Sequence, residues 1–528
     1  MKLFCDSKYI LFPASHHAQN KRVCFHVKGR LVYDLVIPLD NYEPDYIFRL
    51  NMKCFAGEEI ELSVQPEMEL QIQKSDQDIS SEEAYLGKYR PLAHFTAKRG
   101  WLNDPNGLVF YQGKYLMFYQ HNPVGCTWEN MHWGYAVSHD LVHWEEQEIA
   151  LYPDETGTIF SGSAIIDTDN VTGLKENGND VLLLFYTAAG STSKTSENKP
   201  FVQSLAYSTD GGATFRKYHG NPLIGQVAGG NRDPKVIRHE PSGNYIMVLY
   251  LEGHQFALYA SWNLLDWQPL QTIEIPGEIE CPDLYPLPVD GDTEHIKWVL
   301  TGASDKYLVG DFDGLVFTPE TDVKTLKYGG STYAAQSWSG IPDGRRIRTT
   351  SACATIPGMP FASCMSIPQE MSLQTIGGEI CLCAKPVSEI KLLYENTKTV
   401  QHVEIPEGDT YRLRTDGQGY DISLKIIFPE HGEWSLSLLG FTITVSVDQR
   451  LLTCMDCSVP IDCGKNVLEL RILLDTIYVE MFADQGSKFL GLSYIQDRNL
   501  DSLIISPHHG NICVEQLTLS KLKPFWKS

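Results

Sequence analysis

The sequence has no long hydrophobic run, few basic residues and little helical periodicity. It contains no stretch of about 20 consecutive apolar residues, so no membrane-spanning helix is expected. Lys and Arg number 43 against 66 Asp and Glu, which gives a net charge of −23. This balance argues against nucleic acid and anionic membrane surfaces as partners. An uncharged substrate is compatible with it, although solubility alone also explains it.

The cysteines form neither a metal site nor a disulfide framework by their spacing. They number 13, an odd count. The first 20 residues lack the apolar core and small-residue cleavage site of a secretory signal. Together these features predict reduced thiols and a cytoplasmic location.

The pattern of short strands indicates an all-β protein with several domains. A chain of 528 residues exceeds what one hydrophobic core usually serves. Short β-rich runs alternate with Gly, Pro, Asn and Asp turns throughout. Residues 1–88 are predicted to form a small N-terminal β module, and residues 376–528 a C-terminal β-sandwich.

A turn-plus-aromatic repeat marks the segment between these modules, residues 89–375. Each copy has a small residue, then Asp or Asn in a turn, then an aromatic residue. The copies are Ser138–Trp144, Ser208–Phe215, Ser261–Trp267 and, more weakly, Gly310–Phe317. Their interval of roughly 50–70 residues approaches the size of a propeller blade. Blades around an axis leave only short, protected sheet edges; chance recurrence in a β protein is the alternative.

Three acidic residues precede strand pairs in similar settings. Asp104 lies in Trp101–Gly107, and Asp233 and Glu280 are each followed within two residues by proline. Such sequences are also ordinary turn formers, because Pro fixes φ and Gly accepts positive φ. If each repeat closes a blade, each acid begins an innermost strand. The three carboxylates are then predicted to meet in one central channel.

Carboxylates gathered in one pocket cannot all ionise freely, because like charges and desolvation raise at least one pKa. An ionised nucleophile beside a protonated acid is the arrangement that glycosidic cleavage requires. A Ca²⁺ or Mg²⁺ site is the alternative. Since no EF-hand type loop is present and each acid has its own Pro-containing turn, neither a metal nor another cofactor is expected.

The residues around these acids are suited to binding sugar. Amides, hydroxyls and guanidinium groups can bond sugar hydroxyls, and aromatic faces can stack on a sugar ring. Core packing is the alternative for each aromatic residue taken singly. The candidate substrate-binding residues are Trp101, Asn103, Gln120, Trp128, Phe160, Ser161, Arg232 and Trp338.

Ordered motifs in the chain resemble those of glycoside hydrolase family 32, the β-fructofuranosidases. The motifs are Trp101–Gly107, Phe160–Ser163, Arg232–Pro234, Glu280–Pro282, Tyr333–Gln336 and Gly344–Ile347. The resemblance covers roughly residues 89–528. It implies a retaining glycosidase with a five-bladed β-propeller followed by a β-sandwich.

The resemblance also implies roles for individual residues. Asp104 would be the nucleophile, Glu280 the acid/base and Asp233 the transition-state stabiliser. We further hypothesise that Cys281 tunes the pKa of Glu280.

The activity implied is the release of terminal β-D-fructose from levan- or inulin-type fructans, from sucrose, or from both, by double displacement. Alternatives are a sucrose-specific invertase, a fructosyltransferase, an inverting arabinan-type hydrolase and, in another class, a non-catalytic fructan-binding lectin. The partner is therefore a fructose-containing saccharide, and a homodimer is a possible assembly.

Overall fold

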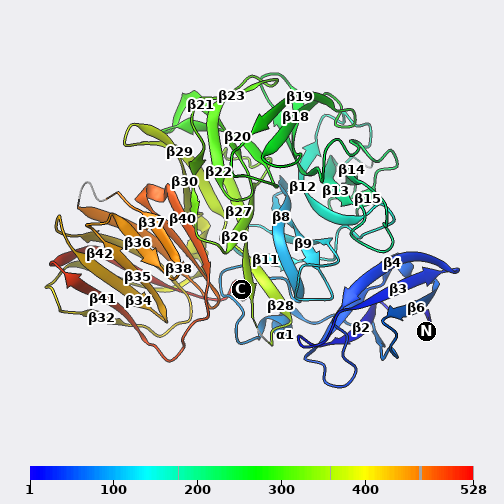
Figure 1. Cartoon of the computed structure of the whole chain (residues 1–528), viewed down its shortest axis with the longest axis horizontal. Coiled ribbons are helices and arrows are strands. Elements are labelled where there is room, and N and C mark those ends of the chain that lie inside the picture. Colours follow the sequence, from blue (N-terminus) through cyan, green and yellow to red (C-terminus); the bar gives the residue numbers. More distant parts are fainter. Residues whose placement is uncertain (177, 357, 463–465, 527–528) are drawn as a thin grey trace.

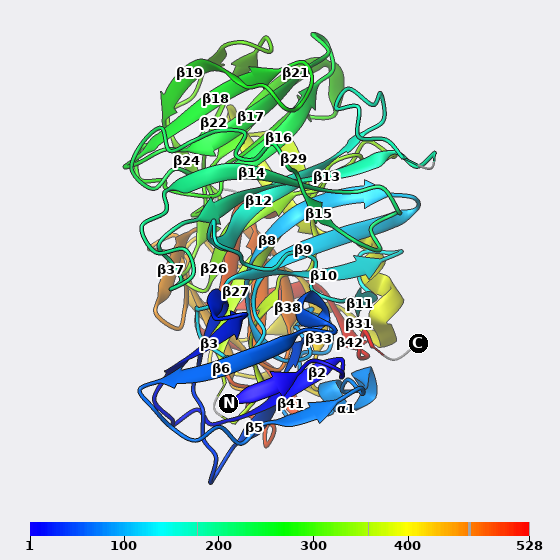
Figure 2. The same cartoon turned by 90° about the vertical axis from the view of Figure 1, so that its right-hand side faces the viewer.

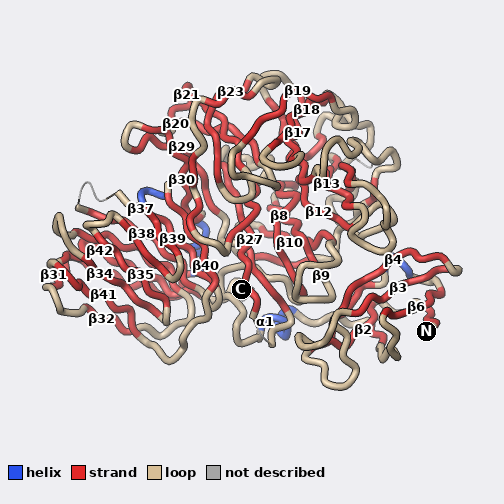
Figure 3. Tube along the Cα trace, viewed as in Figure 1, coloured by secondary structure: helices blue, strands red, loops and turns tan. Residues whose placement is uncertain are grey.

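The regular secondary structure of the chain consists almost entirely of strands, as predicted. The computed structural model describes residues 1–176, 178–356, 358–462 and 466–526. Figure 1 shows three parts in chain order: a small blue N-terminal module, a central body and an orange-to-red C-terminal part, with the two smaller parts on opposite sides of the view. Figure 3 shows how few segments of the chain are helical. None of the described helices is long and apolar enough to cross a membrane.

The N-terminal module consists of two small sheets with strand orders β1-β6-β3-β4 and β5-β2-β7. In β6, Ile60, Leu62 and Val64 are buried between exposed neighbours, the period of a strand with one face on a core. The module's core also takes in side chains of the central body, Trp101 among them. Its elements are β1 (Lys2–Phe4), β2 (Tyr9–Ala14), β3 (Lys21–Val27), β4 (Arg30–Ile37), β5 (Tyr46–Asn51), η1 (Lys53–Phe55), β6 (Glu59–Gln65), β7 (Gln73–Ser75) and α1 (Ser81–Tyr85).

The central body begins with four antiparallel units of four strands each. They are β8 (Gly100–Tyr111), β9 (Lys114–Asn122), β10 (His132–Ser138) and β11 (Trp144–Glu146); β12 (Thr158–Asp167), β13 (Val181–Ala189), β14 (Phe201–Ser208) and β15 (Arg216–Lys217); β16 (Arg232–His239), β17 (Asn244–Tyr250), β18 (Gln255–Ser261) and β19 (Gln268–Glu274); and β20 (Asp283–Val289), β21 (Asp292–Thr301), β22 (Lys306–Phe312) and β23 (Phe317–Pro319). The first strand of the second unit, β12, lies between β8 and β16 (Figure 2).

The remaining strands of the central body are β24 (Lys324–Thr325), β26 (Thr332–Ser337), β27 (Arg346–Thr355), β28 (Phe361–Met365), β29 (Gln369–Ile376) and β30 (Glu379–Pro386). The short strand β25 (Lys327–Tyr328) lies between β24 and β26 in sequence but pairs with a strand of the C-terminal part. Strand β28 pairs with β8 and β29 pairs with β20, both in parallel. Because β26–β30 thereby share one sheet with the first and fourth units, the count of five blades stays a prediction.

The repeat identified in the sequence closes the turn between the third and fourth strands of each unit. The Asp140 carboxylate accepts hydrogen bonds from two backbone N–H groups at 2.8 and 3.1 Å. Asp210, Asn263 and Asp313 cap the corresponding turns in the same way. A short polar side chain that satisfies turn amides is the physical reason for the recurring Asp or Asn.

The C-terminal part is a sandwich of two sheets, with orders β25-β40-β39-β38-β33-β42-β31 and β32-β41-β34-β35-β36-β37. Its elements are η2 (Ser388–Leu393), β31 (Tyr394–Ile405), β32 (Tyr411–Arg414), β33 (Tyr420–Ile427), β34 (Glu433–Leu438), β35 (Phe441–Ser446), β36 (Leu451–Cys454), β37 (Cys457–Pro460), β38 (Val467–Leu474), β39 (Tyr478–Ala483), η3 (Asp484–Gly486), β40 (Lys488–Ser493), β41 (Ser502–His509) and β42 (Ile512–Leu522). The predicted boundary at residue 375 falls in the β29–β30 hairpin, both strands of which belong to the sheet of the central body.

A buried histidine joins the sandwich to the central body. His94 Nδ1 lies 2.9 Å from Asp475 Oδ2, and Nε2 lies 3.1 Å from Glu480 Oε1, with all three side chains fully buried. Burial lowers the pKa of His94, but the bonds to the two carboxylates outweigh it and raise the pKa to about 9. The junction therefore holds an imidazolium between two carboxylates at neutral pH.

Replacement of His94 by Phe should destabilise the protein by about 3–5 kcal/mol, since it leaves buried carboxylates without their cation. Because the pKa of His94 is higher in the folded state, its contribution is fully present below pH about 6.5 and is lost as the pH rises through about 9. The denaturation midpoint of the wild type should fall over this window, and that of His94→Phe should fall less.

The exposed pair His431–Asp448 supplies the control. Because surface ion pairs contribute little, His431→Phe should barely move the midpoint. An equal effect of both substitutions would contradict the importance of the buried junction.

Candidate active site

The three predicted acids line one cavity of about 310 Å³. Asp104 lies in β8, Asp233 at the start of β16 and Glu280 in the turn before β20. Each therefore belongs to the first strand of a unit or directly precedes it, as the spacing of the repeats predicts. The other lining residues are Asn103, Gln120, Trp128, Phe160, Ser161, Arg232 and Tyr333.

Irregular strand register aims these side chains at the cavity. Asn103 and Asp104 in β8, Ser161 in β12, and Asp233 with Pro234 in β16 all fall where the pairing shifts. A bulge bends a strand and redirects the side chain that it leaves unpaired. The sequence predicts a turn at 101–107; the structure corrects this, because the segment lies within β8 and its Pro and Gly accompany two bulges rather than a chain reversal.

The backbone is also held in an uncommon conformation at two of the acids. Asp233 has φ of 65° and Glu280 has φ of 56°, both in the left-handed region. For non-glycine residues such a conformation costs about 1–3 kcal/mol and persists only where the surroundings enforce it. The fold therefore accepts strain to orient these two carboxylates.

Asp104 is held by three neighbours. Ser161 Oγ donates to its Oδ2 at 2.7 Å, Asn103 Nδ2 donates to Oδ1 at 3.1 Å, and Cys281 Sγ lies 3.5 Å from Oδ2. Burial raises the pKa of Asp104, the Ser161 bond lowers it, and the charge of Glu280 raises it, with an upward net shift. These contacts fix the orientation of the carboxylate.

Asp233 is buried and lies among the charges of Arg232, Glu280 and Asp104. Burial raises its pKa to about 7, against the lowering effect of Arg232, whose Nε lies 3.8 Å from Oδ2. The charges of Glu280 and Asp104 add to the rise. The backbone N–H of Cys281 donates to Asp233 Oδ2 at 3.1 Å. Asp233 can thus carry a proton near neutral pH.

Glu280 receives a donor on each oxygen. Arg232 pairs with Oε1, and the Tyr333 hydroxyl donates to Oε2 at 2.8 Å. Arg232 itself stacks on the Tyr250 ring, 4.6 Å from its centroid. Tyr333 is a cavity residue that the sequence reasoning missed, although it begins the motif Tyr333–Gln336; its position relative to Glu280 depends on how β26 closes the ring.

Cys281 lies between two acids rather than against the third. Its thiol is 3.5 Å from both Asp104 Oδ2 and Asp233 Oδ2. Burial and the surrounding carboxylates raise its pKa well above the usual range, so the group is a neutral thiol. Its direct contacts are therefore with Asp104 and Asp233, and the tuning of Glu280 by Cys281 stays a hypothesis.

Two aromatic residues form the outer wall of the cavity. Trp128 is 51% exposed, and its ring meets that of Phe160 edge to face at 5.9 Å. An indole that is half exposed beside a pocket can receive an apolar ligand face. Gln120 lies deeper, with its Nε2 donating to Ile159 O at 2.9 Å.

The other two predicted aromatic residues do not line the cavity. Trp338 is buried in the core, where its Nε1 donates to Leu116 O at 3.0 Å and its ring stacks on Trp144. Core packing takes the ring away from the cavity, so the structure does not bring Trp338 together with the other predicted substrate-binding residues. Trp101 lies behind the wall, with Nε1 donating to Asn103 Oδ1 at 2.9 Å.

A ring of buried hydrogen bonds forms a floor beneath the cavity and joins β8, β12, β16, β20 and β26. From β8 to β12, Asn106 Oδ1 accepts from Gly162 N at 3.1 Å, and from β12 to β16, Ser163 Oγ contacts Pro234 O and Val236 N, each at 2.8 Å. From β16, Lys235 Nζ reaches Asp283 of β20 at 3.3 Å and Ser337 O of β26 at 2.7 Å, and Asp283 Oδ2 accepts from Ser337 N at 2.6 Å. From β26, Gln336 returns to Leu108 N of β8 at 3.3 Å and to Gly162 O of β12 at 3.0 Å.

A second cavity of about 350 Å³ lies along the same strands beyond the floor. It is lined by residues that follow the floor positions in sequence, such as Val109, Ile165, Ile237 and Leu284. The floor thus divides the channel, and the cavity that holds the acids is blind at its inner end.

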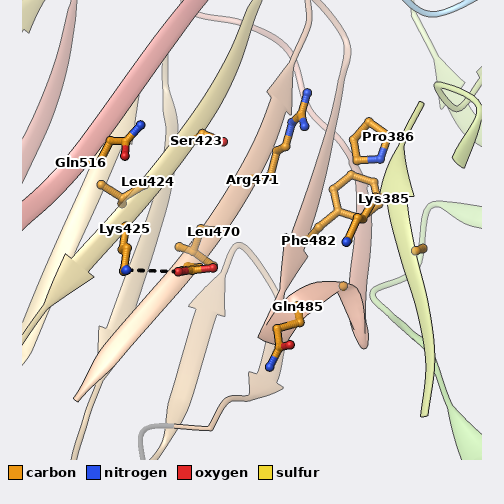
Figure 4. A pocket seen from close by; sticks show the side chains of 13 residues that line it. Lys385, Pro386, Ser423, Leu424, Lys425, Leu470, Arg471, Phe482, Gln485 and Gln516 are labelled. Carbon is orange, nitrogen blue, oxygen red and sulfur yellow. Dashed lines mark ion pairs between the residues drawn. The ribbon is translucent and has the colours of Figure 1, made fainter. Parts of the chain in front are cut away.

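A further hollow lies between β30 and the sandwich (Figure 4). Two of its charged side chains are paired, with Lys425 Nζ 3.6 Å from Glu469 and Arg471 2.6 Å from Asp421. It lacks the crowded carboxylates of the first cavity. Across the described ranges, no group of three or more His, Cys, Asp or Glu side chains is placed to hold a metal ion.

The chain is similar to known glycosidases. Residues 94–386 match the family model for the glycosyl hydrolases family 32 N-terminal domain. A levanase of Bacillus subtilis is 33% identical over 502 residues, covering 85% of this chain and 72% of the relative. The extracellular exo-inulinase inuE of Aspergillus niger is 33% identical, covering 64% of this chain and 72% of the relative.

Solved structures of this family have the same fold. The exo-inulinase of Aspergillus awamori gives a TM-score of 0.75 at 26% identity, covering 84% of this chain and 100% of that one. The fructofuranosidase of Schwanniomyces occidentalis with fructose gives 0.74 at 24% identity, covering 82% of this chain and 98% of that one. The predicted β-propeller followed by a β-sandwich is confirmed.

Replacement of Ser161 by Ala should raise the pKa of Asp104 further, because it removes a hydrogen bond to the ionised carboxylate. Titration of the aspartate carboxyl carbons by ¹³C NMR measures this shift. Ser208→Ala breaks a similar 2.7 Å bond to Asp210 and should leave the Asp104 signal unchanged. A Ser161→Ala protein in which Asp104 titrates as in the wild type would refute the proposed balance.

Proposed function

We propose that this chain, which belongs to glycoside hydrolase family 32, releases terminal β-D-fructose from fructans of the levan or inulin type, from sucrose, or from both. The observation that carries the proposal is the placement of Asp104, Asp233 and Glu280 in one blind cavity. The names of the relatives, levanase, exo-inulinase and invertase, support the substrate class.

In the proposed reaction Asp104 attacks the anomeric carbon of the terminal fructose. Glu280 gives its proton to the departing glycosidic oxygen, and the fructose becomes bound to Asp104 through an ester. Water then attacks the same carbon, Glu280 takes a proton from it, and the Asp104 carboxylate leaves. Retention of configuration follows from the two displacements.

Arg232 links substrate binding to the protonation of Glu280. In the free protein its guanidinium pairs with Glu280 Oε1. A fructose hydroxyl that takes this donor frees Oε1 to carry the proton that the leaving group needs. Asp233, beside Arg232, is proposed to hold neighbouring hydroxyls and to stabilise the charge that develops on the sugar.

A fructosyltransferase remains the second candidate, because it would use the same residues and replace water by a sugar. The deciding measurement resolves products by chain length from sucrose, short inulin chains and levan. Fructose as the sole early product supports exo-hydrolysis. Oligosaccharides longer than the substrate at high sucrose indicate transfer, and a ladder of shorter oligosaccharides from levan indicates internal cleavage.

Removal of the proposed nucleophile by Asp104→Asn should abolish fructose release, because an amide forms no ester under these conditions. Glu280→Gln should lower kcat by about 10²–10⁴-fold, the usual contribution of a general acid. Both are measured by fructose release together with thermal unfolding. Asp311→Asn, at a solvent-exposed carboxylate paired with Lys297, is the control and should keep wild-type activity.

Activity of folded Asp104→Asn at the wild-type level would overturn this assignment of roles. A lectin, which binds without cleaving, would show no fructose release even from the wild type.

A further inference from the structure

The N-terminal module grips the segment that carries the outer wall of the cavity. Its edge strand β4 offers the backbone of Val36, whose N–H donates to Asn130 Oδ1 at 2.8 Å and whose carbonyl accepts from Asn130 Nδ2 at 2.7 Å. Asn130 Nδ2 also reaches Asn122 Oδ1 at 3.1 Å, and Asn122 Nδ2 donates to Thr127 O at 3.0 Å. Trp128 follows in this loop, so its backbone is fixed from both sides.

A second contact ties the same segment to the module's interior. The buried Tyr33 hydroxyl lies 2.5 Å from His132 Nε2, and His132 Nδ1 lies 2.5 Å from Asn130 O. Burial lowers the pKa of His132 to about 3, so the ring is neutral at ordinary pH. A neutral ring that donates from Nδ1 accepts at Nε2, which fits Tyr33 as the donor.

A third contact reaches the loop behind Phe160. Asp34, which is buried, accepts from Thr195 N at 2.8 Å, from Thr195 Oγ1 at 2.6 Å and from Lys194 N at 3.1 Å. The Phe201 ring, beyond this loop, packs edge to face against Phe160 at 5.6 Å. The carboxylate of one module thus orders a loop that abuts the wall of the other.

A fourth contact leads directly to the proposed nucleophile. The Trp101 ring packs against the module's core. Its Nε1 donates a hydrogen bond to Asn103 Oδ1 at 2.9 Å, and Asn103 Nδ2 donates to Asp104 Oδ1 at 3.1 Å. The module therefore backs the cavity behind Asn103 as well as behind Trp128 and Phe160.

We propose that the N-terminal module is a built-in part of the substrate site, with Tyr33 and Asp34 as positioning residues for the wall formed by Trp128 and Phe160. This inference rests on the proposed function. Because these residues do not line the cavity, they act through the wall. Their loss therefore weakens saccharide binding, and so raises KM, more than it lowers kcat.

The module has another attachment that supplies a matched control. Asn51 Nδ2 donates to Glu148 Oε2 at 2.5 Å, and Lys8 Nζ pairs with Glu148 Oε1 at 2.6 Å. Glu148 follows β11, the outermost strand of the first unit, and does not line the cavity. Asn51→Ala therefore loosens the junction without touching the wall.

The test compares KM and kcat for fructose release from a short inulin chain in full-length Asp34→Ala, Tyr33→Phe and Asn51→Ala, with thermal unfolding measured on each. Loss of interactions that hold the substrate wall should raise KM by about 5- to 10-fold in Asp34→Ala and change kcat by less than about 2-fold. Tyr33→Phe should shift KM in the same direction by less. Asn51→Ala should leave both constants within about 2-fold of the wild type, even where it lowers the unfolding temperature.

Should Asp34→Ala fail to fold, Thr195→Val removes one of its bonds, and KM should still rise. A folded Asp34→Ala or Thr195→Val protein with wild-type KM overturns the inference, as does an equal rise in KM for Asn51→Ala. A wild-type enzyme that releases no fructose overturns the proposed function, and the inference falls with it. If the wild type releases fructose normally and the variants have the same KM as the wild type, the inference is refuted but the proposed function stands.

Discussion

The ring of buried hydrogen bonds that forms the floor of the cavity is the constraint on which the site depends. Strands β8, β12, β16, β20 and β26 come from distant parts of the chain, and they meet through side chains such as Asn106, Ser163, Lys235 and Gln336. Buried polar groups of this kind are costly unless every partner is present. The floor therefore fixes how the strands are aligned along the channel, and with that alignment the level at which each acid enters the cavity.

Above this floor, geometry and electrostatics work together. Irregular register at Asp104 and Asp233 and left-handed backbone at Glu280 place the carboxylates so close that their charges and their burial shift two of the pKa values upward. The donors Ser161, Arg232 and Tyr333 then distinguish the acids from one another. The strain of the backbone is tolerated because the floor and the flanking ladders over-determine it.

Much of the architecture could be predicted from the sequence, because turns and strand periods are local signals. The Asp or Asn turns, the strands of the sandwich and the meeting of the acids all follow from short-range patterns. The bulges at 103–104 do not, since Asp-Pro-Asn-Gly has the same local preferences in a turn and in a bulged strand. The sequence also could not tell that Trp338 lies in the core and Tyr333 lines the cavity. Which way each aromatic side chain points depends on how β26 packs against the other first strands, and residue spacing does not encode this packing.

The positioning of the wall shows the same dependence on distant segments. Nothing in the sequence near Val36 or Asp34 indicates a role beside the cavity, because the partners, Asn130 and Thr195, lie far along the chain. Their contacts exist only once two independently patterned modules are packed together. A module that looks separable in sequence is, in space, the back of the pocket wall.

The blind end of the cavity has a consequence for how a polymer is degraded. A chain cannot thread past the floor, so it enters end first beside Trp128 and Phe160 and leaves by the same route. Under the proposed release of terminal fructose, the freed sugar would lie deepest, and the shortened chain would have to withdraw before that sugar could leave. Each encounter would then remove one unit, so that a population of chains would shorten together rather than one chain at a time.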